Sequence, residues 1–577
     1  MASPNGRVVA PAQFPPPVDS QHEFIKRELD SEEERIEVGV AIVGGGPAGL
    51  ACANKLLQLL ADERVGGPDV MERLGEVPVA VVEKGKACGA HNLSGAMMRP
   101  SGLQELFPDS EPKDWPTYGQ VDKDSVYWML SPNRALPLKP TPPPFRNHGN
   151  YVVSVAELSR WLAEKAEEAG AYILTETAAA QLLVEDGAVR GIRSGDKGRG
   201  KDGTPLGNFE PGADVTAQAT VLAEGTWGHL TGAAIREFDL AANREPQVWA
   251  LGVKEVWKVP RKLDRVIHTL GWPLRYGASH KEFGGSWIYP MGDDRVSIGF
   301  VVGLDYTDAT VSGHDLLQQF KTSKLVRRIL EGGERVAWGA KAIPEGGYWA
   351  MPKLSAPGMV IAGDAGGMVN VPVLKGIHYA IHAGILAAEE IFAKLKAGSN
   401  DFSRYEQAVE DSLIGKELYQ SRNMKQPFGK GFFVGGAITN AMVVSKGRFP
   451  GGRWANHRDA EAPVYLGDKK DGYPKPDGKY TFDKLSSVYI TGNATRDDAP
   501  NHIRVRENVP REVAEAWAWM CPAGVYEVPE DAGGGDEFGN VDVIVNYTNC
   551  VQCGAITAKG GRLTTPEGGD GPLYQVT

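Results

Sequence analysis

Cysteine is scarce in this chain, and its apolar residues never gather into a long run. Five cysteines in 577 residues, an odd number, do not resemble a disulfide framework, so a reducing compartment is expected. No stretch of about 18 apolar residues occurs, which excludes a membrane-spanning helix. The segment Met1–Ser20 is Pro-rich and lacks both the apolar core of a secretory signal and the arginine-rich pattern of a transit peptide. We predict a flexible lead over residues 1–35.

Positive charge is also in the minority. The formal net charge is −11, which makes the chain a poor candidate for general nucleic-acid binding, so no nucleic-acid partner is expected. A chain of 577 residues with a hydrophobic fraction of 42% can bury a large core, and it is too long for one ordinary domain. We therefore expect more than one domain.

A dinucleotide-binding pattern occupies the N-terminal part of the chain. Apolar residues Val38–Val43 predict a buried strand, Gly44, Gly46 and Gly49 follow as G-x-G-x-x-G, and Ala51–Leu60 predicts a helix. The first glycine permits the tight turn, the second lets the backbone approach a pyrophosphate, and the third lets the helix pack closely on the strand. The helix N-terminus offers free N–H groups and the positive end of its dipole to phosphates.

An acidic residue follows the second predicted strand. The strand VPVAVVEKG places Glu83 where it can accept hydrogen bonds from a ribose. Glu83 lies further along than the usual distance of about 20 residues, and the insertion Asp62–Glu76 accounts for the difference. Strand, helix and acidic residue in this order predict a dinucleotide site. The alternative is a Gly-rich turn that binds nothing.

A later segment favours FAD over NAD. Met359–Asn370 reads as a short apolar strand ending in Gly363 and Asp364, and a helix is predicted over Ile377–Leu395. In many FAD enzymes such a Gly-Asp pair places a carboxylate near the ribityl chain and pyrophosphate. A plain Asp N-cap is the alternative. Thr220–Gly228 predicts another strand-to-glycine turn of the same fold, so the FAD domain is discontinuous.

Two stretches are predicted as insertions into this domain. Tyr127–Asn147 is Pro-rich and does not favour a helix or a central strand. The second runs over residues 237–340 and contains FGGSWIY, in which Gly284 and Gly285 stand between aromatic residues. Paired glycines suit a backbone that approaches a flat ligand closely. A β-bulge or a hairpin turn is the alternative.

The window Lys425–Arg453 is basic in an acidic chain. It has no Asp or Glu, and its apolar core Phe432–Val444 is flanked and punctuated by five basic residues: Lys425, Lys430, Lys446, Arg448 and Arg453. The core is too short to span a bilayer but suits a helix or loop at the headgroup level, with basic side chains reaching anionic lipid. A buried core helix with basic ends is the alternative.

The remaining cysteine pattern lies near the C-terminus. Cys521 precedes a proline, and Cys550 and Cys553 form a C-x-x-C turn, which points two sulfurs at one metal edge. Zinc would need four nitrogen or sulfur ligands, and His502 is the nearest histidine. Three unrelated cysteines are the alternative to an iron–sulfur site.

From about Val38 to the C-terminus, the chain resembles the electron-transfer flavoprotein–ubiquinone oxidoreductase family. The resemblance is carried by many short segments: GAHNLSGA (Gly89–Ala96), RNHGNY (Arg146–Tyr151), GWPL (Gly271–Leu274), FGGSWIY (Phe283–Tyr289), VGLDY (Val302–Tyr306), EGGERVAWGAKAIPEGG (Glu331–Gly347), NVPVLKGIHYAI (Asn370–Ile381), YPKPDGKYTFDKLSSV (Tyr473–Val488), CPAGVYE (Cys521–Glu527) and PEGGDGPLY (Pro566–Tyr574).

The resemblance implies an α/β (α+β overall) fold: a Rossmann-type FAD-binding domain, an interleaved β-rich quinone-binding domain and a C-terminal ferredoxin-like iron–sulfur domain. The expected boundaries are 36–110, 148–236 and 341–420 for FAD, 111–147 and 237–340 for quinone, 421–460 for a membrane-surface segment, and 461–577 for the cluster. It adds Ser94 and Gly95 to the FAD contacts and makes Gly284 and Gly285 contacts of the quinone ring.

The chain departs from the family at the cluster. The family has C-x-x-C-x-x-C after the CPAG cysteine, whereas the last position here is Ile556. The family cluster is [4Fe–4S]. Three thiolates leave open a three-iron cluster, a four-iron cluster with a non-cysteine or solvent ligand, or an empty site.

The resemblance implies an electron relay in which a reduced electron-transfer flavoprotein donates electrons through FAD, and through the cluster where one is bound, to ubiquinone or menaquinone. The enzyme is expected to be peripheral on the cytoplasmic side of a bacterial inner membrane, with the mitochondrial inner membrane as the alternative. No catalytic acid or base stands out. Alternatives are a flavin reductase of isoprenoid chains such as geranylgeranyl groups, a cluster-less flavin:quinone reductase with another donor, and a non-catalytic membrane-associated module.

Overall fold

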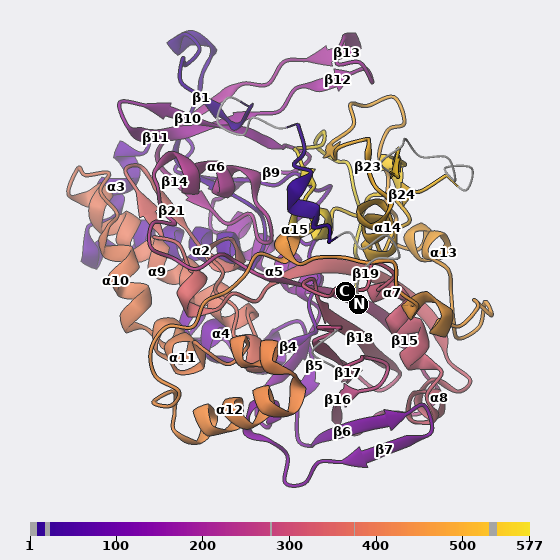
Figure 1. The fold of residues 1–577 in the computed structure, drawn as a ribbon. Coiled ribbons are helices and arrows are strands. Elements are labelled where there is room, and N and C mark those ends of the chain that lie inside the picture. Colours follow the sequence, from indigo (N-terminus) through magenta and orange to yellow (C-terminus); the bar gives the residue numbers. More distant parts are fainter. Residues whose placement is uncertain (1–7, 18–22, 277–279, 374, 530–538) are drawn as a thin grey trace.

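A computed structural model describes residues 8–17, 23–276, 280–373, 375–529 and 539–577 (Figure 1). Two large sheets organise the chain, and the C-terminal segment packs beside the second of them. The architecture confirms the predicted class: a Rossmann-type FAD domain, an interleaved β-rich domain and a C-terminal part of small sheets and short helices.

The first sheet forms the core of the FAD domain. Its order is β1 (Ile25–Lys26), β10 (Ala179–Glu185), β11 (Ala188–Ser194), β14 (Asp214–Leu222), β2 (Ile36–Val43), β3 (Val79–Val82) and β9 (Tyr172–Leu174), with β21 (Met359–Ile361) beside β14 and β20 (Ser355–Ala356) beside β21. Strands β14, β2, β3 and β9 run parallel. Because helices cover both faces of this parallel region, β3 and the end of β2 over Val40–Val43 are continuous apolar runs.

Two long helices cover one face of this sheet. They are α2 (Pro47–Ala61) and α9 (Ile377–Lys396), which confirm the two predicted helices. Gly384 lets them approach closely, because a Cβ there would lie 2.2 Å from the Ala48 carbonyl oxygen. The same domain contains α3 (Gly67–Arg73), α4 (Ser101–Leu106), α5 (Val155–Glu168), α6 (His229–Glu237), α10 (Arg404–Asp411) and α11 (Leu413–Ser421).

The second sheet is mostly antiparallel. Its order is β19 (Glu334–Pro344), β15 (Trp249–Lys258), β18 (Arg295–Gly303), β17 (Gly284–Met291), β16 (Val266–Gly271), β6 (Asp124–Ser131) and β7 (Arg134–Pro137). Helices α7 (Gly313–Lys321) and α8 (Lys324–Leu330) help to bury one face. The Pro-rich insertion contributes the edge hairpin β6–β7, where proline does not interrupt a central ladder. Gly284 and Gly285 pair with β18 in regular register, so they form neither a bulge nor a hairpin turn.

The C-terminal part consists of short elements. Its helices are α13 (Lys484–Tyr489), α14 (Arg511–Met520) and α15 (Ala555–Ala558). Its strand pairs are β22 (Ile503–Arg504) with β27 (Arg562–Leu563), β23 (Val509–Pro510) with β25 (Asn540–Val541), and β24 (Tyr526–Glu527) with β26 (Ile544–Val545). Elsewhere β12 (Lys197–Arg199) pairs with β13 (Pro205–Glu210), and β8 (Tyr151–Val153) with β4 (Met97–Met98) and β5 (Thr117–Gln120).

The prediction of a flexible lead over residues 1–35 is wrong for much of its described part. Strand β1 joins the first sheet through β10, and the side chains of Phe24 and Ile25 are buried. Lys26 also forms an ion pair with the buried carboxylate of Asp214. A Pro-rich composition predicts a segment that keeps its conformational freedom. Here the buried side chains and the ion pair stabilise the ordered segment and offset the entropy that it loses.

One helix stands at the lower end of the molecule in Figure 1, near the β6–β7 hairpin. It is α12 (Phe432–Val444), with the bounds expected from the sequence. Trp128 of β6 holds its first turn, with ring centroids 4.7 Å from Phe432 and 6.0 Å from Phe433. Within the described ranges, no helix is long and apolar enough to cross a bilayer.

Candidate cofactor-binding site

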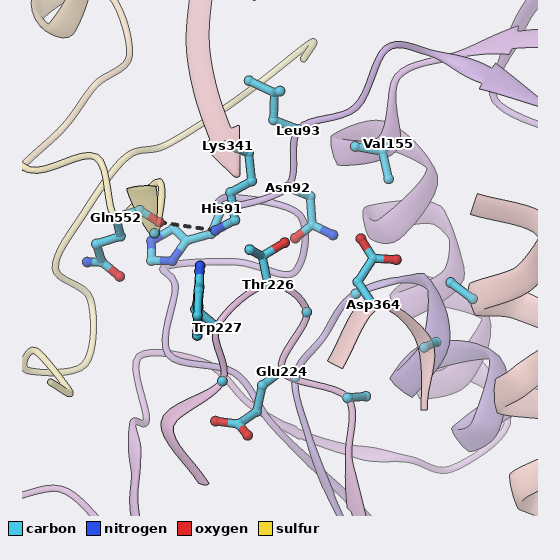
Figure 2. Close-up of a pocket in the computed structure, with 18 of the residues that line it drawn as sticks. His91, Asn92, Leu93, Val155, Glu224, Thr226, Trp227, Lys341, Asp364 and Gln552 are labelled. Atoms are coloured by element: carbon cyan, nitrogen blue, oxygen red, sulfur yellow. Dashed lines mark hydrogen bonds between the residues drawn. The ribbon is translucent and has the colours of Figure 1, made fainter. Parts of the chain in front are cut away.

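A cavity of about 320 Å³ opens at the carboxyl ends of the parallel strands β2, β3 and β14. This volume lies within the range of sites for small molecules and cofactors. Ligands bind at this edge of open parallel sheets, because loops and helix N-termini converge there. Figure 2 shows side chains from the loops that follow strands of the first sheet, from β19 of the second sheet and from the C-terminal segment around this one space.

The glycines of the fingerprint have the local geometry that the sequence predicts. Gly44 has φ +110°, and a Cβ there would lie 2.3 Å from the Ala223 carbonyl oxygen. Gly46 caps α2 and lines the cavity. A Cβ on Gly49 would lie 2.1 Å from the Gly44 carbonyl oxygen, so glycine is required where the helix crosses the turn.

Glu83 is held rigidly at the cavity wall. Its Oε2 accepts a hydrogen bond from the Gly45 N–H at 2.9 Å, and its Oε1 accepts one from the Gly85 N–H at 2.7 Å. The side chain is buried and lines the cavity. Its carboxylate is thus fixed in one orientation, with further lone pairs available to ribose hydroxyl groups.

Gly363 and Asp364 lie in the turn after β21, at the start of the 3₁₀ helix Gly363–Gly366. Gly363 has φ +71°, and a Cβ there would lie 2.9 Å from the Ala48 Cβ. Asp364 points into the cavity (Figure 2). Burial raises the pKa of Asp364 to about 6, and the positive charge of Lys341 opposes this rise.

Ser94 and Gly95 line the opposite wall of the cavity. The Ser94 carbonyl oxygen accepts a hydrogen bond from the buried ammonium of Lys254 at 3.0 Å. A Cβ on Gly95 would lie 3.8 Å from the rings of Trp287 and Tyr289, both of which also line the cavity. A flat ring system therefore has aromatic walls from the second sheet on this side.

Gly284 and Gly285 lie outside the lining of this cavity. They begin β17, the strand that supplies Trp287 and Tyr289 to the cavity, and Gly285 pairs with Val301, another lining residue. Gly284 has φ +154°, and a Cβ there would lie 2.0 Å from the Val301 carbonyl oxygen. On the other side, the ring of Phe283 lies 4.6 Å from that of Phe428. The two glycines thus stand between the cavity and the segment that leads into α12.

Several lining residues had no signal in the sequence. Buried side-chain nitrogens that have no partner among the described residues surround the cavity: Nδ1 of His91, Nε1 of Trp227, and both ring nitrogens of His502. Burial lowers the pKa of His502 to about 3, so its imidazole is neutral near pH 7. Unpaired polar atoms inside a protein are costly unless a ligand or water satisfies them, so this lining fits a polar cofactor such as FAD.

The three C-terminal cysteines converge on a second, small cavity. Cys521 follows α14, Cys550 and Cys553 flank a tight turn, and Ile556 lies on α15; all four side chains line the same space. Backbone N–H groups of Val525 and Gln552 donate to the sulfurs of Cys521 and Cys550 at 3.4 and 3.3 Å. Such donors stabilise the thiolates that hold iron–sulfur clusters.

Burial disfavours the thiolate forms of Cys550 and Cys553 as long as nothing binds them. Burial raises the pKa of Cys553 to about 12, and the negative charge of Cys521 adds to this rise. The pKa of Cys550 is raised by the same causes, burial first. A bound metal displaces these protons, and mutual repulsion between thiolates then favours a cationic centre between them. The convergence and the N–H donors fit an iron–sulfur cluster at three of its corners.

The cysteine turn also forms part of the first cavity. Gln552, between the two cysteines, lines it, and its side-chain oxygen accepts a hydrogen bond from Lys84 at 2.6 Å. The Gln552 carbonyl oxygen accepts one from Lys341 at 3.2 Å (Figure 2). The Ala342 N–H donates to the Cys553 carbonyl oxygen at 2.8 Å. The cysteine cavity and the dinucleotide cavity thus share a wall, and Gly554 and Leu563 line both of them.

Helix α12 exposes apolar side chains. Phe433 is 79% and Val444 85% exposed, and only Gly435 and Met442 are buried in this helix, so it is not a core helix. Further exposed apolar side chains are Val434, Phe449, Leu130 and Leu136. Lys430, Lys446 and Arg448 are exposed as expected.

Two of the five basic residues in this window have other roles. Lys425 is largely buried and forms an ion pair with Glu345 at 2.7 Å, and Arg453 pairs with Glu245 at 2.6 Å. The expectation that Lys425 faces lipid is therefore wrong: the carboxylate of Glu345, on the cavity wall, attracts it inward.

Family models match three parts of the chain. They are described as FAD binding domain (residues 138–252), ETF-QO, ubiquinone-binding (residues 249–343) and electron transfer flavoprotein-ubiquinone oxidoreductase, 4Fe-4S (residues 478–575). The solved structure of a geranylgeranyl bacteriochlorophyll reductase-like protein from Thermoplasma acidophilum has a TM-score of 0.52 at 16% identity, over 71% of this chain and 92% of that one. At this identity the likeness concerns the fold alone.

Curated relatives match almost the whole chain. The mitochondrial electron transfer flavoprotein-ubiquinone oxidoreductase of Bos taurus is 38% identical over 97% of this chain and 92% of its own. That of Caenorhabditis elegans is 36% identical over 95% and 93%. The probable electron transfer flavoprotein-ubiquinone oxidoreductase of the bacterium Acinetobacter baylyi is 35% identical over 94% and 99%. The chain therefore belongs to the electron transfer flavoprotein–ubiquinone oxidoreductase family.

Proposed function

We propose that this enzyme takes electrons from a reduced electron-transfer flavoprotein and passes them to a membrane quinone. The observation that carries the proposal is the position of Gln552, which belongs to the cysteine turn and to the wall of the dinucleotide cavity. A cluster and a flavin bound in these two places are separated by a thin layer of protein. Relatives from mitochondria and from a bacterium carry the corresponding activity in their names.

The chain provides a built site for FAD, whose ring system, when bound, supplies one- and two-electron chemistry. In this proposal Gly44, Gly46 and Gly49 admit the pyrophosphate at the N-terminus of α2. Glu83 orients the ribose, because its carboxylate is braced by two backbone N–H groups. Asp364 is assigned to the other end of the cofactor, with Gly363 in the turn that places it.

Ser94 and Gly95 complete the proposed FAD contacts. Lys254 of β15 donates a hydrogen bond to the Ser94 carbonyl oxygen, so this loop is held at a fixed position relative to the second sheet. Trp287 and Tyr289 then exclude water from the far side of the cavity, since both rings are buried against it.

The quinone ring is assigned to Gly284 and Gly285. The absence of side chains there leaves backbone groups within reach of a flat ring, and neighbouring strand β18 leads from them to Val301 at the FAD cavity. Phe283 and Phe428 border the same point on the side of α12. An isoprenoid tail has an apolar route from the lipid along this side. The choice between ubiquinone and menaquinone rests on the family and favours ubiquinone.

The enzyme is proposed to sit on a membrane surface through α12 and the β6–β7 hairpin. Exposed Phe433, Val434 and Val444 would enter the headgroup region, and Lys430, Lys446 and Arg448 would meet anionic lipid. We assign it as a peripheral protein to the cytoplasmic side of a bacterial inner membrane. The domain boundaries given above remain our proposal for dividing the chain.

Rapid-mixing spectroscopy tests the function. The full chain, loaded with FAD, is mixed with reduced electron-transfer flavoprotein, and its flavin absorbance is followed before and after addition of a short-chain ubiquinone. Reduction by the flavoprotein followed by reoxidation by quinone is expected. Slow reduction by the flavoprotein together with rapid reduction by NADPH or ferredoxin would contradict the proposal and favour an isoprenoid reductase.

A further inference from the structure

The cysteine cavity has an aliphatic side chain at its fourth position. Cys550, Cys553 and position 556 follow one another at three-residue intervals, and these side chains line one space together with Cys521. Ile556 is 4% exposed. The fold therefore brings position 556 to the place where a fourth thiolate would complete a four-cysteine site, and isoleucine has no ligand atom to offer.

The surrounding backbone is adapted to this isoleucine. A Cβ on Gly561 would lie 2.5 Å from Cγ1 and 3.0 Å from Cδ1 of Ile556, so the glycine leaves the room that the branched side chain occupies. The Gly561 N–H also donates to the Ile556 carbonyl oxygen at 2.9 Å. Ile556 is therefore packed into the wall of the site.

The remaining wall is almost entirely apolar. Besides the three cysteines, the side chains that line the cavity are Met520, Ala523, Val525, Tyr526, Val551, Ala555, Ile556 and Leu563. Among them only Met520 and Tyr526 carry a heteroatom. An iron atom at the Ile556 corner would face hydrocarbon, and a water ligand there would lack the two or more polar partners that a buried water needs.

The spacing of the sulfurs also argues against a single metal ion. Among the described residues, no three histidine, cysteine or carboxylate side chains come close enough to coordinate one ion. The three thiols nevertheless line one cavity, which suits a polynuclear centre held by all three.

We propose that this site binds a three-iron, four-sulfide cluster through Cys521, Cys550 and Cys553. Each iron of such a cluster takes three inorganic sulfides and one thiolate, so three thiolates complete it. The corner that a fourth iron would fill lies against Ile556. This inference goes beyond the proposed function, which routes electrons through a cluster only where one is bound and does not fix the number of irons.

Electron paramagnetic resonance tests the assignment on the full chain purified without oxygen. A three-iron cluster is paramagnetic with half-integer spin when oxidised and loses that signal on one-electron reduction. A four-iron cluster of the usual ferredoxin type shows the opposite pattern. We expect the three-iron pattern with about three irons per FAD, unchanged after incubation with excess ferrous iron and sulfide.

Substitution at position 556 sharpens the test. Ile556→Cys supplies the missing thiolate and is expected to raise iron to about four per FAD and to move the half-spin signal to the reduced state. The matched control Ile556→Ala changes the packing without adding a ligand, and it should keep the three-iron pattern. FAD is measured in every sample, so that loss of the fold is distinguished from loss of the cluster.

Two outcomes would overturn the assignment. One is a reduced-state half-spin signal with about four irons in the native chain, in which case Tyr526→Phe and Met520→Leu would identify the substitute ligand. The other is FAD-containing protein without iron, before and after reconstitution. Neither outcome decides the proposed function, because flavin reduction by the flavoprotein and reoxidation by quinone are measured separately on the same preparations.

Discussion

At the scale of single residues, Glu83 ties the dinucleotide turn to the second strand through one carboxylate. We expect Glu83→Gln to weaken FAD binding by roughly tenfold to a hundredfold, since charged hydrogen bonds contribute about 1.5–3 kcal/mol. The substituted amide turns an NH₂ group toward Gly45 N–H or Gly85 N–H, where two donors then oppose each other. Titration of the apoprotein with FAD, followed by flavin fluorescence, measures the change. The exposed Glu76→Gln is the control, and equal affinity of the two variants would contradict the role of Glu83.

A buried carboxyl in the second half of the chain gives a pH-dependent stability. Burial raises the pKa of Asp459 from 3.8 to about 8, and Lys425 opposes this rise. Between about pH 4 and 8 the folded state then keeps a proton that the unfolded state loses, so stability falls as the pH rises through this window. Oδ2 of Asp459 accepts a hydrogen bond from the Trp249 N–H at 2.7 Å. The side-chain oxygen of an asparagine at this position can accept the same bond.

Asp459→Asn should remove this contribution. We expect the free energy of unfolding of the variant to depend less steeply on pH between about 4 and 8, by on the order of 1 kcal/mol per pH unit. Denaturant unfolding at several pH values measures it, and the exposed Asp109→Asn should behave as the unsubstituted chain does. Unchanged pH dependence in Asp459→Asn would show that its carboxyl does not hold the proton.

At the scale of elements, α12 offers apolar side chains where a water-soluble helix would be polar. Burial of the Phe433 ring in a lipid surface would contribute about 2 kcal/mol to membrane binding. Phe433→Glu removes this contribution and places a charge at the same position. We expect at least a tenfold loss of binding to vesicles containing anionic lipid. Co-sedimentation with the vesicles measures this.

A matched control uses another exposed apolar residue. Leu485 is 60% exposed and belongs to α13, a helix that lies well away from α12 in Figure 1. Leu485→Glu should bind vesicles as the native chain does. Equal loss in both variants would indicate nonspecific adsorption, and no loss in Phe433→Glu would remove α12 from the membrane contact.

Elements differ in how far the sequence predicts them. Strand β2, the glycine turn and α2 follow from local rules, since an apolar run, a fixed glycine spacing and a small-residue helix lie next to one another. The first and last residues of α12 also follow from the local sequence, but the exposure of its side chains does not. The sequence of an all-apolar helix is the same whether the helix is buried or exposed. The environment of α12 depends on its contact with Trp128, which is far away in the chain. Lys425 was misplaced for the same reason, because its partner Glu345 lies on another element.

At the scale of the whole molecule, the two candidate cofactor sites meet through contacts that no sequence spacing predicts. Lys84 and Gln552 are 468 positions apart and form a hydrogen bond of 2.6 Å. Lys84 follows Glu83, which we propose to bind the ribose, and Gln552 lies within the cysteine turn. The sequence identified both motifs but contained no signal that they share a wall, because only the packing of the C-terminal segment on the other domains brings them together.

This shared wall predicts a shared electrostatic response. Lys84 lines the dinucleotide cavity together with the carboxylates of Glu83 and Glu224, and it donates to the side chain of Gln552 in the cysteine turn. A cation near an electron acceptor stabilises the reduced form, so Lys84→Met should lower the reduction potentials of the flavin and of the cluster together, each by tens of millivolts. Coulomb attraction at about 10 Å in an effective dielectric of about 20 has this magnitude.

Potentiometric titration followed by absorbance and by electron paramagnetic resonance reads the two centres in one sample. Lys165→Met, on the exposed side of α5, removes a charge from the protein surface and should leave both potentials within error. A shift of one centre without the other would mean that the two sites are electrostatically separate. Parallel shifts would mean that the charge at their common wall stabilises the reduced form of both centres, while the difference between the two potentials stays the same.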